Sequence, residues 1–221
     1  MKRSFERRIY TWPAFRQAVR QVFGQMDDLK RAARSGRVNK RFAEKLMLAV
    51  TRVNGCRYCA DGHTRAALAM GVPESELQHL MSGDLGSFPP EEAVGLAFAQ
   101  HYAESRGEID PAAWQRLVEA YGEETAQDIL PYLRMITFGN LYGNTFDALL
   151  SRLVGKPAPD SSLWSELGVL LGVFILVPLE LLRRLGRKTP QEQTQRGNPS
   201  PASAPGSPLG TDSESALRNT L

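Results

Sequence analysis

No segment of the 221-residue sequence shows the alternation of apolar and polar residues that marks a half-buried β-strand. Apolar residues recur instead at intervals of three and four. Many of these segments begin at proline or at a residue that caps helices, and end at glycine. The sequence therefore predicts an all-α fold.

The helical pattern divides the first part of the chain into seven segments. The expected helices lie at about residues 12–36, 38–53, 55–70, 72–83, 89–105, 110–122 and 124–153. The first carries Pro13 in its first turn and is predicted to end at Gly36. In the second, the residues expected to face inward are Phe42, Leu46, Ala49, Val50 and Val53.

Composition shifts along the chain indicate four parts. We expect a basic arm at 1–11, a helical domain at 12–156 and, after the linker "GKPAPDSS", a hydrophobic helix with a basic end at 163–186. From Thr189 onward Gln, Pro, Ser, Gly and Thr dominate, and such a segment cannot bury enough apolar surface to fold. Residues 189–221 are therefore predicted to be a disordered tail.

Basic residues are concentrated at the start of the chain. Residues 1–41 contain twelve Lys and Arg against three acidic residues, although the whole chain has a formal net charge of only +3. Most of these charges lie at helical spacing between apolar residues, which is typical of a solvated helix face. Because no DNA- or RNA-binding motif accompanies them, we expect no nucleic-acid partner.

The chain has two cysteines, Cys56 and Cys59. Two cysteines cannot form the disulfide framework of a small secreted protein, and the N-terminus lacks an apolar run like that of a signal peptide. We therefore expect a cytoplasmic protein. In that compartment a close cysteine pair is typical of catalysis or metal binding.

Cys56, Cys59 and His63 share one face of the helix expected at 55–70, because their spacing is i, i+3 and i+7. The first turn of a helix favours an anion, so the position of Cys56 lowers the pKa of its thiol. One turn separates the two sulfurs, and His63 is one turn beyond Cys59, where it can exchange a proton with it. This pattern indicates a redox-active dithiol.

Two other interpretations stay open at this point. A zinc site could use Cys56, Cys59 and His63, but a structural zinc needs a fourth ligand, and the sequence has no second cysteine cluster. The cysteines could also be two small buried residues on a core helix.

The motif "E44-(x11)-C56-R-Y-C59-A-D-G-H63", followed by "Gly71-Val-Pro-Glu", resembles the alkyl hydroperoxidase D-like branch of the carboxymuconolactone decarboxylase family. The resemblance extends over the helical layout from about residue 15 to 153. It implies an all-α, alkyl hydroperoxidase D-like helical bundle that forms trimers or multiples of trimers. It also implies a thiol-dependent peroxidase or disulfide reductase that needs no metal or organic cofactor. The decarboxylases proper lack the cysteine pair, so its presence argues against lactone decarboxylation.

The same resemblance implies a role for each residue of the site. Cys59 would be the thiolate that attacks a peroxide, Cys56 would resolve the sulfenic acid to a disulfide, and Glu44 and His63 would form a proton relay. From the residues alone, helix position favours Cys56 as the thiol of lower pKa, whereas the nearby His63 favours Cys59. Without the resemblance, we would interpret Glu44 as a charged residue on the protein surface.

Four further polar or aromatic residues have a structural interpretation. We expect Tyr58 to pack between helices. Asn140, Tyr142 and Asn144 interrupt an apolar helix, and we expect them to be buried groups that form hydrogen bonds.

The segment from Leu167 to Leu182 contains one charged residue, Glu180. It is slightly short for a membrane span and contains Pro178. The sequence leaves two alternatives open: a helix that attaches to the membrane, or one that packs against the domain or a second subunit.

Together these features predict a cytoplasmic, oligomeric thiol oxidoreductase that reduces a hydroperoxide and is regenerated by an external thiol or dithiol that we cannot name. Attachment through residues 163–186 would place it at the inner face of the membrane. The alternative is a redox sensor or membrane-associated scaffold of the same fold that uses the thiols without turnover.

Overall fold

The computed structural model describes residues 5–186, and over that range the chain is all-helical, as the sequence predicts. The helices are α1 (Trp12–Gly24), α2 (Met26–Ser35), α3 (Lys40–Asn54), α4 (Arg57–Ala69), α5 (Glu74–Ser82), α6 (Pro90–Glu104), α7 (Pro111–Tyr121), α8 (Glu123–Leu153) and α9 (Leu163–Gly186). The tail predicted at 189–221 lies outside the described residues.

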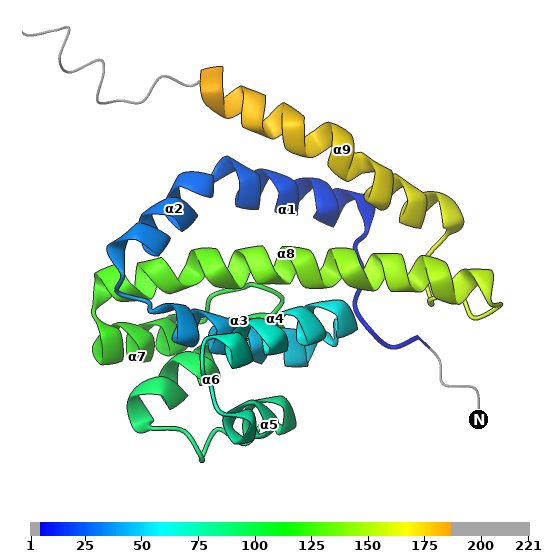
Figure 1. Ribbon diagram of the computed structural model, residues 1–221. Helices are drawn as coiled ribbons and strands as arrows, with labels where there is room; N and C mark the ends of the chain where they lie inside the picture. Colours follow the sequence, from blue (N-terminus) through cyan, green and yellow to red (C-terminus); the bar gives the residue numbers. More distant parts are fainter. Residues whose placement is uncertain (1–4, 187–221) are drawn as a thin grey trace, which may run out of the picture. The chain divides into compact units, whose positions relative to one another are not determined.

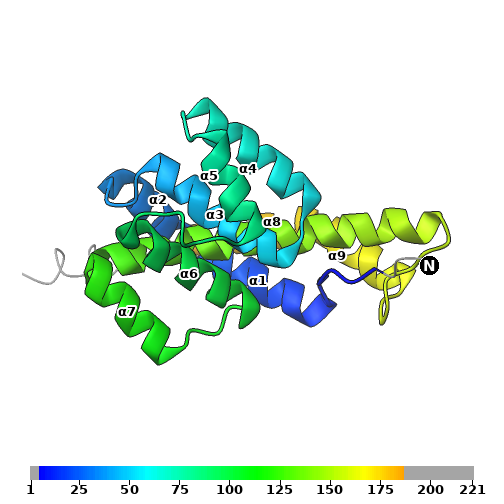
Figure 2. The ribbon, with the colours of Figure 1, turned by 90° about the horizontal axis from the view of Figure 1, so that it is seen from below.

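The long helix α8 lies between two groups of helices, with α1 on one side and α3 and α4 on the other (Figure 1). α3 contacts α4, α5, α6 and α8, so it is the central helix of the larger hydrophobic core. Figure 2 shows α4 and α5 on one side of α3, with α6 and α7 on the other. A smaller core forms between α1, α8 and α9 around Phe15, Val19, Phe138 and Val169.

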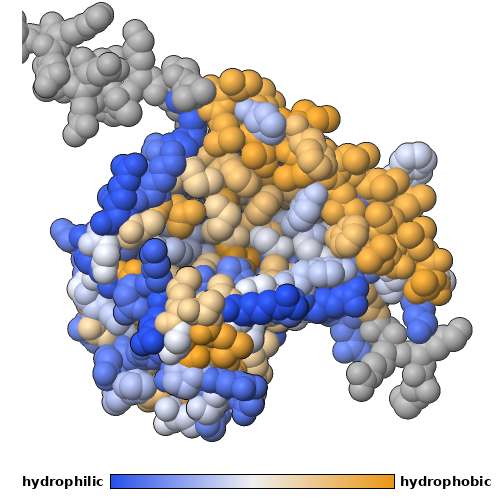
Figure 3. Space-filling model, in the orientation of Figure 1, coloured by the Kyte–Doolittle hydropathy of each residue, from blue (hydrophilic) through white to orange (hydrophobic). Residues whose placement is uncertain are grey.

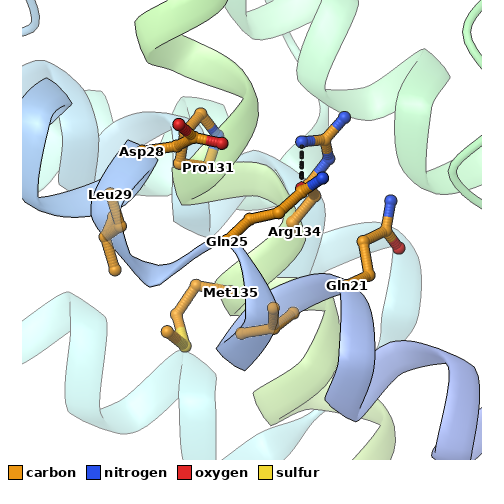
Figure 4. Close-up of a pocket in the computed structure, with 8 residues that line it drawn as sticks. Gln21, Gln25, Asp28, Leu29, Pro131, Arg134 and Met135 are labelled. Carbon is orange, nitrogen blue, oxygen red and sulfur yellow. Dashed lines mark hydrogen bonds between the residues drawn. The ribbon is translucent and has the colours of Figure 1, made fainter. Parts of the chain in front are cut away.

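The segment 12–36 is two helices, whereas the sequence analysis expected one. The break is at Gln25, which has φ −113° and ψ 27°. Its side chain accepts a hydrogen bond from Arg134 of α8 at 2.9 Å (Figure 4). At Gly24 an added Cβ would lie only 3.2 Å from a carboxylate oxygen of Glu180 in α9. The chain turns here because α1 packs against both α8 and α9, while α2 packs against α8.

Capping residues and glycines mark several helix ends, and Pro13 and Gly36 lie where the sequence predicts them. Thr11 caps α1, with Pro13 in the first turn, and Gly36 ends α2 in the left-handed conformation at φ 71°. Asp110 caps α7 and accepts a hydrogen bond from the backbone N–H of Ala113 at 2.7 Å. Local capping chemistry therefore defines these boundaries.

One face of α9 packs on α1 and α8. Val169 is fully buried, and at Gly172 an added Cβ would lie 2.7 Å from the ring of Trp12, so this helix approaches α1 closely. The buried carboxylate of Glu166 accepts two hydrogen bonds of 2.9 Å from Arg152 at the end of α8. Among the described residues α9 is also the one helix long and apolar enough to cross a membrane.

Candidate active site

The connection between α3 and α4 positions the cysteine pair. Gly55 ends α3 with φ 72°, and its N–H donates to the carbonyl of Thr51 at 2.8 Å. The left-handed conformation favours glycine, and an added Cβ there would lie 3.2 Å from the side chain of Arg7, which is a tight contact. The helix expected to start at residue 55 therefore starts at Arg57. Cys56 is its N-cap and does not lie inside the first turn.

The sulfur atoms of Cys56 and Cys59 are 3.0 Å apart, and both thiols are free. As the N-cap, the sulfur of Cys56 also accepts a hydrogen bond from the backbone N–H of Cys59 at 3.4 Å. Cys56 is buried, whereas Cys59 is only half-buried. A small movement can therefore close a disulfide, and Cys59 is the sulfur more accessible from outside.

The pKa values of the two thiols shift in opposite directions. The hydrogen bond from the Cys59 thiol is the largest cause that lowers the pKa of Cys56 to about 6. Burial opposes this shift, while backbone N–H groups and the charge of Arg7 add to it. The pKa of Cys59 is raised, first by the same hydrogen bond and then by burial and the charge of Cys56. These directions favour the thiolate on Cys56 and the proton on Cys59.

Titration of the reduced protein is expected to show thiolate absorbance that rises with pH through a midpoint near 6, the pKa of Cys56. Because this pKa is lowered, the thiolate is present above the midpoint and is lost as the pH falls through it. The rate of alkylation by iodoacetamide should follow the same curve.

Two variants control that titration. Cys59→Ala removes the hydrogen-bond donor, so the midpoint should move toward the ordinary cysteine value of about 8.5. Cys56→Ser should remove the transition near pH 6. A wild-type midpoint close to the ordinary value would contradict the geometry.

Two glycines of α8 make room for the cysteine pair. A Cβ at Gly143 would lie 2.8 Å from the sulfur of Cys56, which is closer than real Cβ contacts allow. A Cβ at Gly139, one turn earlier, would lie 3.9 Å from the sulfur of Cys59, an ordinary contact. α4 therefore begins directly against a glycine face of α8. The sequence analysis missed this face, and the available signal was the Gly-x-x-x-Gly spacing within an apolar helix.

Gly143→Ala is expected to push the sulfur of Cys56 away from Cys59 and to raise the midpoint of the thiolate titration. Overpacking of this kind should also lower the free energy of unfolding by about 1–3 kcal/mol. Gly139→Ala is the matched control: its Cβ fits, and alanine favours a helix over glycine by up to about 1 kcal/mol. Thiolate titration and thermal unfolding of both variants check this. Equal effects at both positions would contradict the close approach at Gly143.

Glu44 of α3 and His63 of α4 form a hydrogen-bonded pair. Nδ1 of His63 lies 2.7 Å from Oε2 of Glu44, and both side chains are partly shielded from solvent. A carboxylate on Nδ1 fixes the orientation and tautomer of the ring and leaves Nε2 for a further partner. His63 follows Cys59 by one turn of α4, although within residues 5–186 it makes no hydrogen bond to either sulfur.

The buried carboxylate of Asp147 binds cationic side chains near the cysteine pair. Asp147 of α8 forms ion pairs with Arg7 and Arg57 and accepts a hydrogen bond from the hydroxyl of Tyr58 at 3.2 Å. Arg7 in turn contributes to the lowered pKa of Cys56. Neither Asp147 nor Arg7 was a candidate from sequence, because only the fold brings residues so distant in the chain together.

The segment before α1 is attached along α8. Asn144 donates to the backbone carbonyl of Arg8 at 3.0 Å, and the backbone N–H of Tyr10 donates to Thr145 at 3.1 Å. These contacts hold the predicted basic arm, from residue 5 onward, in a place where Arg7 reaches Asp147.

The remaining polar residues singled out from sequence have structural partners. Asn140 accepts a hydrogen bond from Thr51, and Asn144 donates to the carbonyl of Asn54. The hydroxyl of Tyr142 donates to the carbonyl of Leu170 in α9. Asn140 and Asn144 are buried, as expected, whereas Tyr142 is half-buried. Tyr58, which was expected to pack between helices, is exposed.

These features define an all-helical domain with a dithiol at the start of one helix. A carboxylate–imidazole pair joins that helix to its neighbour. Among residues 5–186 no group of three or more His, Cys, Asp or Glu side chains is arranged to hold a metal ion.

Comparison with known proteins finds a family model that matches part of this chain. Residues 17–85 match the model of the carboxymuconolactone decarboxylase family, which confirms the resemblance seen in the sequence. All four site residues, Glu44, Cys56, Cys59 and His63, lie inside the matched segment.

A protein of Bacillus subtilis (strain 168), "Uncharacterized protein YdfG", is 26% identical to this chain over 117 residues. The alignment covers 52% of this chain and 80% of that relative. No solved structure gives a significant match.

Proposed function

We propose that the chain is a thiol-dependent peroxidase of the alkyl hydroperoxidase D-like kind. It reduces hydroperoxides, and the disulfide that forms in each cycle is reduced again by an external dithiol. The observation that carries the proposal is the pair of free sulfurs, 3.0 Å apart, at the start of α4, where the next turn holds His63 in its pair with Glu44 of α3. The family of the matched segment supports it, because that family includes alkyl hydroperoxidase D-like members.

Cys59 attacks the peroxide because it is the more accessible sulfur. Its proton passes to the thiolate of Cys56 along the 3.0 Å hydrogen bond as the sulfur binds the distal peroxide oxygen. The O–O bond breaks, and the alkoxide leaves as an alcohol with a proton delivered through His63. Cys59 is then a sulfenic acid, and Cys56 is a neutral thiol.

Cys56 resolves the intermediate. Its thiol loses the proton and attacks the sulfur of Cys59, the S–OH bond breaks, and hydroxide leaves as water. The product is an intramolecular disulfide, in agreement with the short distance between the sulfurs. A dithiol reductant then supplies two electrons by thiol–disulfide exchange and restores both thiols. No metal or organic cofactor enters the cycle.

The assembly and location that accompany this proposal come from the family resemblance and the sequence. We expect a homo-oligomer, a trimer or a multiple of trimers, in the cytoplasm. Sedimentation of the full chain checks the assembly.

The test is peroxide consumption by the reduced full chain, with a dithiol reductant supplied, together with a thiol count before and after peroxide alone. Repeated turnover together with loss of both thiols supports a dithiol peroxidase. Loss of both thiols without turnover favours the redox sensor. If peroxide leaves both thiols intact, the proposed chemistry is wrong.

A further inference from the structure

The outward face of α9 is a continuous apolar surface. Its most exposed large side chains are Trp164, Leu171, Phe174, Ile175 and Leu182, which are 61–81% exposed. Figure 3 shows this apolar surface in orange along α9. At the rise of an α-helix the row from Trp164 to Leu182 is about 27 Å long. Single exposed apolar residues are ordinary, but a row of this length marks an interaction surface.

The inward face of α9 ties the helix to the domain. Glu166 and Glu180 are buried, and Glu166 is held by Arg152 of α8. Near the other end of the helix, Arg184 forms an ion pair with Asp27 of α2. A transmembrane orientation would break these ion pairs and carry two carboxylates into hydrocarbon, which is strongly unfavourable. Only the outward face of α9 is therefore available to bind a partner.

The edge of the apolar face next to α1 is cationic. A groove between α1 and α9 is lined by Arg16 and Arg20 from α1 and by Arg183 from α9, beside Leu176 and Leu179. All three arginines are exposed. The one carboxylate that lines the groove, Glu180, is buried and already pairs with Arg183.

We propose that the exposed face of α9 binds the surface of an anionic lipid bilayer, with the helix parallel to the membrane plane. The row from Trp164 to Leu182 enters the outer acyl region, and the three arginines meet the lipid phosphates. The positive charge beside this face argues against a second copy of the chain as the partner that covers it. A second copy would bring the same cationic edge, and the two carboxylates of α9, Glu166 and Glu180, are buried.

The proposal rests on α9 and does not depend on the peroxidase reaction, so either can fail without the other. Its test is flotation of the full chain with vesicles of phosphatidylglycerol and phosphatidylcholine, compared with vesicles of phosphatidylcholine alone. We expect flotation with the anionic vesicles that weakens as salt is added. Tryptophan emission should shift to the blue on binding, because Trp164 leaves water.

Matched variants separate the apolar face from its charged edge. The double variant Phe174→Glu, Ile175→Glu should lower vesicle binding at least about tenfold. Arg16→Gln and Arg20→Gln should each lower binding to the anionic vesicles about fivefold. The double variant Leu68→Glu, Met70→Glu, at the exposed end of α4, places the same two charges elsewhere and should bind like the wild type. Thermal unfolding of each variant shows that the fold is retained.

Three outcomes would overturn the proposal. The first is no flotation of the wild type with anionic vesicles. The second is retention in the membrane after an alkaline carbonate wash, which indicates a spanning helix. The third is a dimer in vesicle-free solution that the Phe174→Glu, Ile175→Glu variant dissociates, because a second copy then covers the face.

Discussion

Cys59→Ser is expected to reduce peroxide consumption to the uncatalysed background. The hydroxyl of serine cannot replace a sulfur that attacks oxygen and then forms a disulfide. Cys56→Ser should slow the first step, because the thiolate that accepts the proton of Cys59 is lost. It should also stop the cycle after that step, because no second sulfur lies 3.0 Å away to resolve the sulfenic acid. Steady-state peroxide consumption and mass spectrometry of the product after a sulfenic-acid trap measure both effects.

The two variants also decide which sulfur attacks. A persistent sulfenic acid on Cys59 in the Cys56→Ser variant agrees with attack by the more accessible sulfur. The reverse pattern, with a sulfenic acid on Cys56 in the Cys59→Ser variant, would show that the sulfur of lower pKa attacks despite its burial. Unimpaired turnover in both variants would refute the dithiol cycle.

Glu44→Gln is expected to lower kcat/KM for the peroxide by about 10²-fold, the range in which a positioned proton-transfer group contributes. The amide keeps the size of the side chain but loses the carboxylate that orients His63 from 2.7 Å. His63→Ala should have a similar effect. The double variant should be little worse than either single one, because the two side chains act as one unit.

The matched control is Glu119→Gln on the exposed surface of α7, which should leave kcat/KM unchanged. If the effects of Glu44→Gln and His63→Ala multiply in the double variant, the two groups act separately and the relay is wrong. A change in KM alone would assign the pair to peroxide binding.

The helices were largely predictable because their signals are local. Capping residues such as Thr11 and Asp110, and a terminating glycine such as Gly36, act within a turn or two of their own position. The spacing of Cys56, Cys59 and His63 along one segment is equally local. The sequence could therefore indicate both the all-α fold and the centre of the candidate site.

The features that the sequence did not reveal depend on contacts between distant segments. The break at Gln25 follows from the way α1 packs against α9, which begins nearly 140 residues later. The ion pair between Asp147 and Arg7 joins α8 to the N-terminal segment, and the close approach of Gly143 to Cys56 joins α8 to the start of α4. A single sequence does not show which of its distant residues come into contact, so these features could not be predicted from it.

The glycine connection between α3 and α4 makes the site sensitive to chain length. Glu44 and Cys56 are held at a fixed offset because α3 is continuous from Glu44 to Asn54 and Gly55 ends it in the left-handed conformation, with its N–H bonded to the carbonyl of Thr51. One residue added or removed between Glu44 and Gly55 would rotate the carboxylate by about 100° around the helix axis, away from His63. A variant of this chain therefore cannot change the length of that stretch and keep the pair.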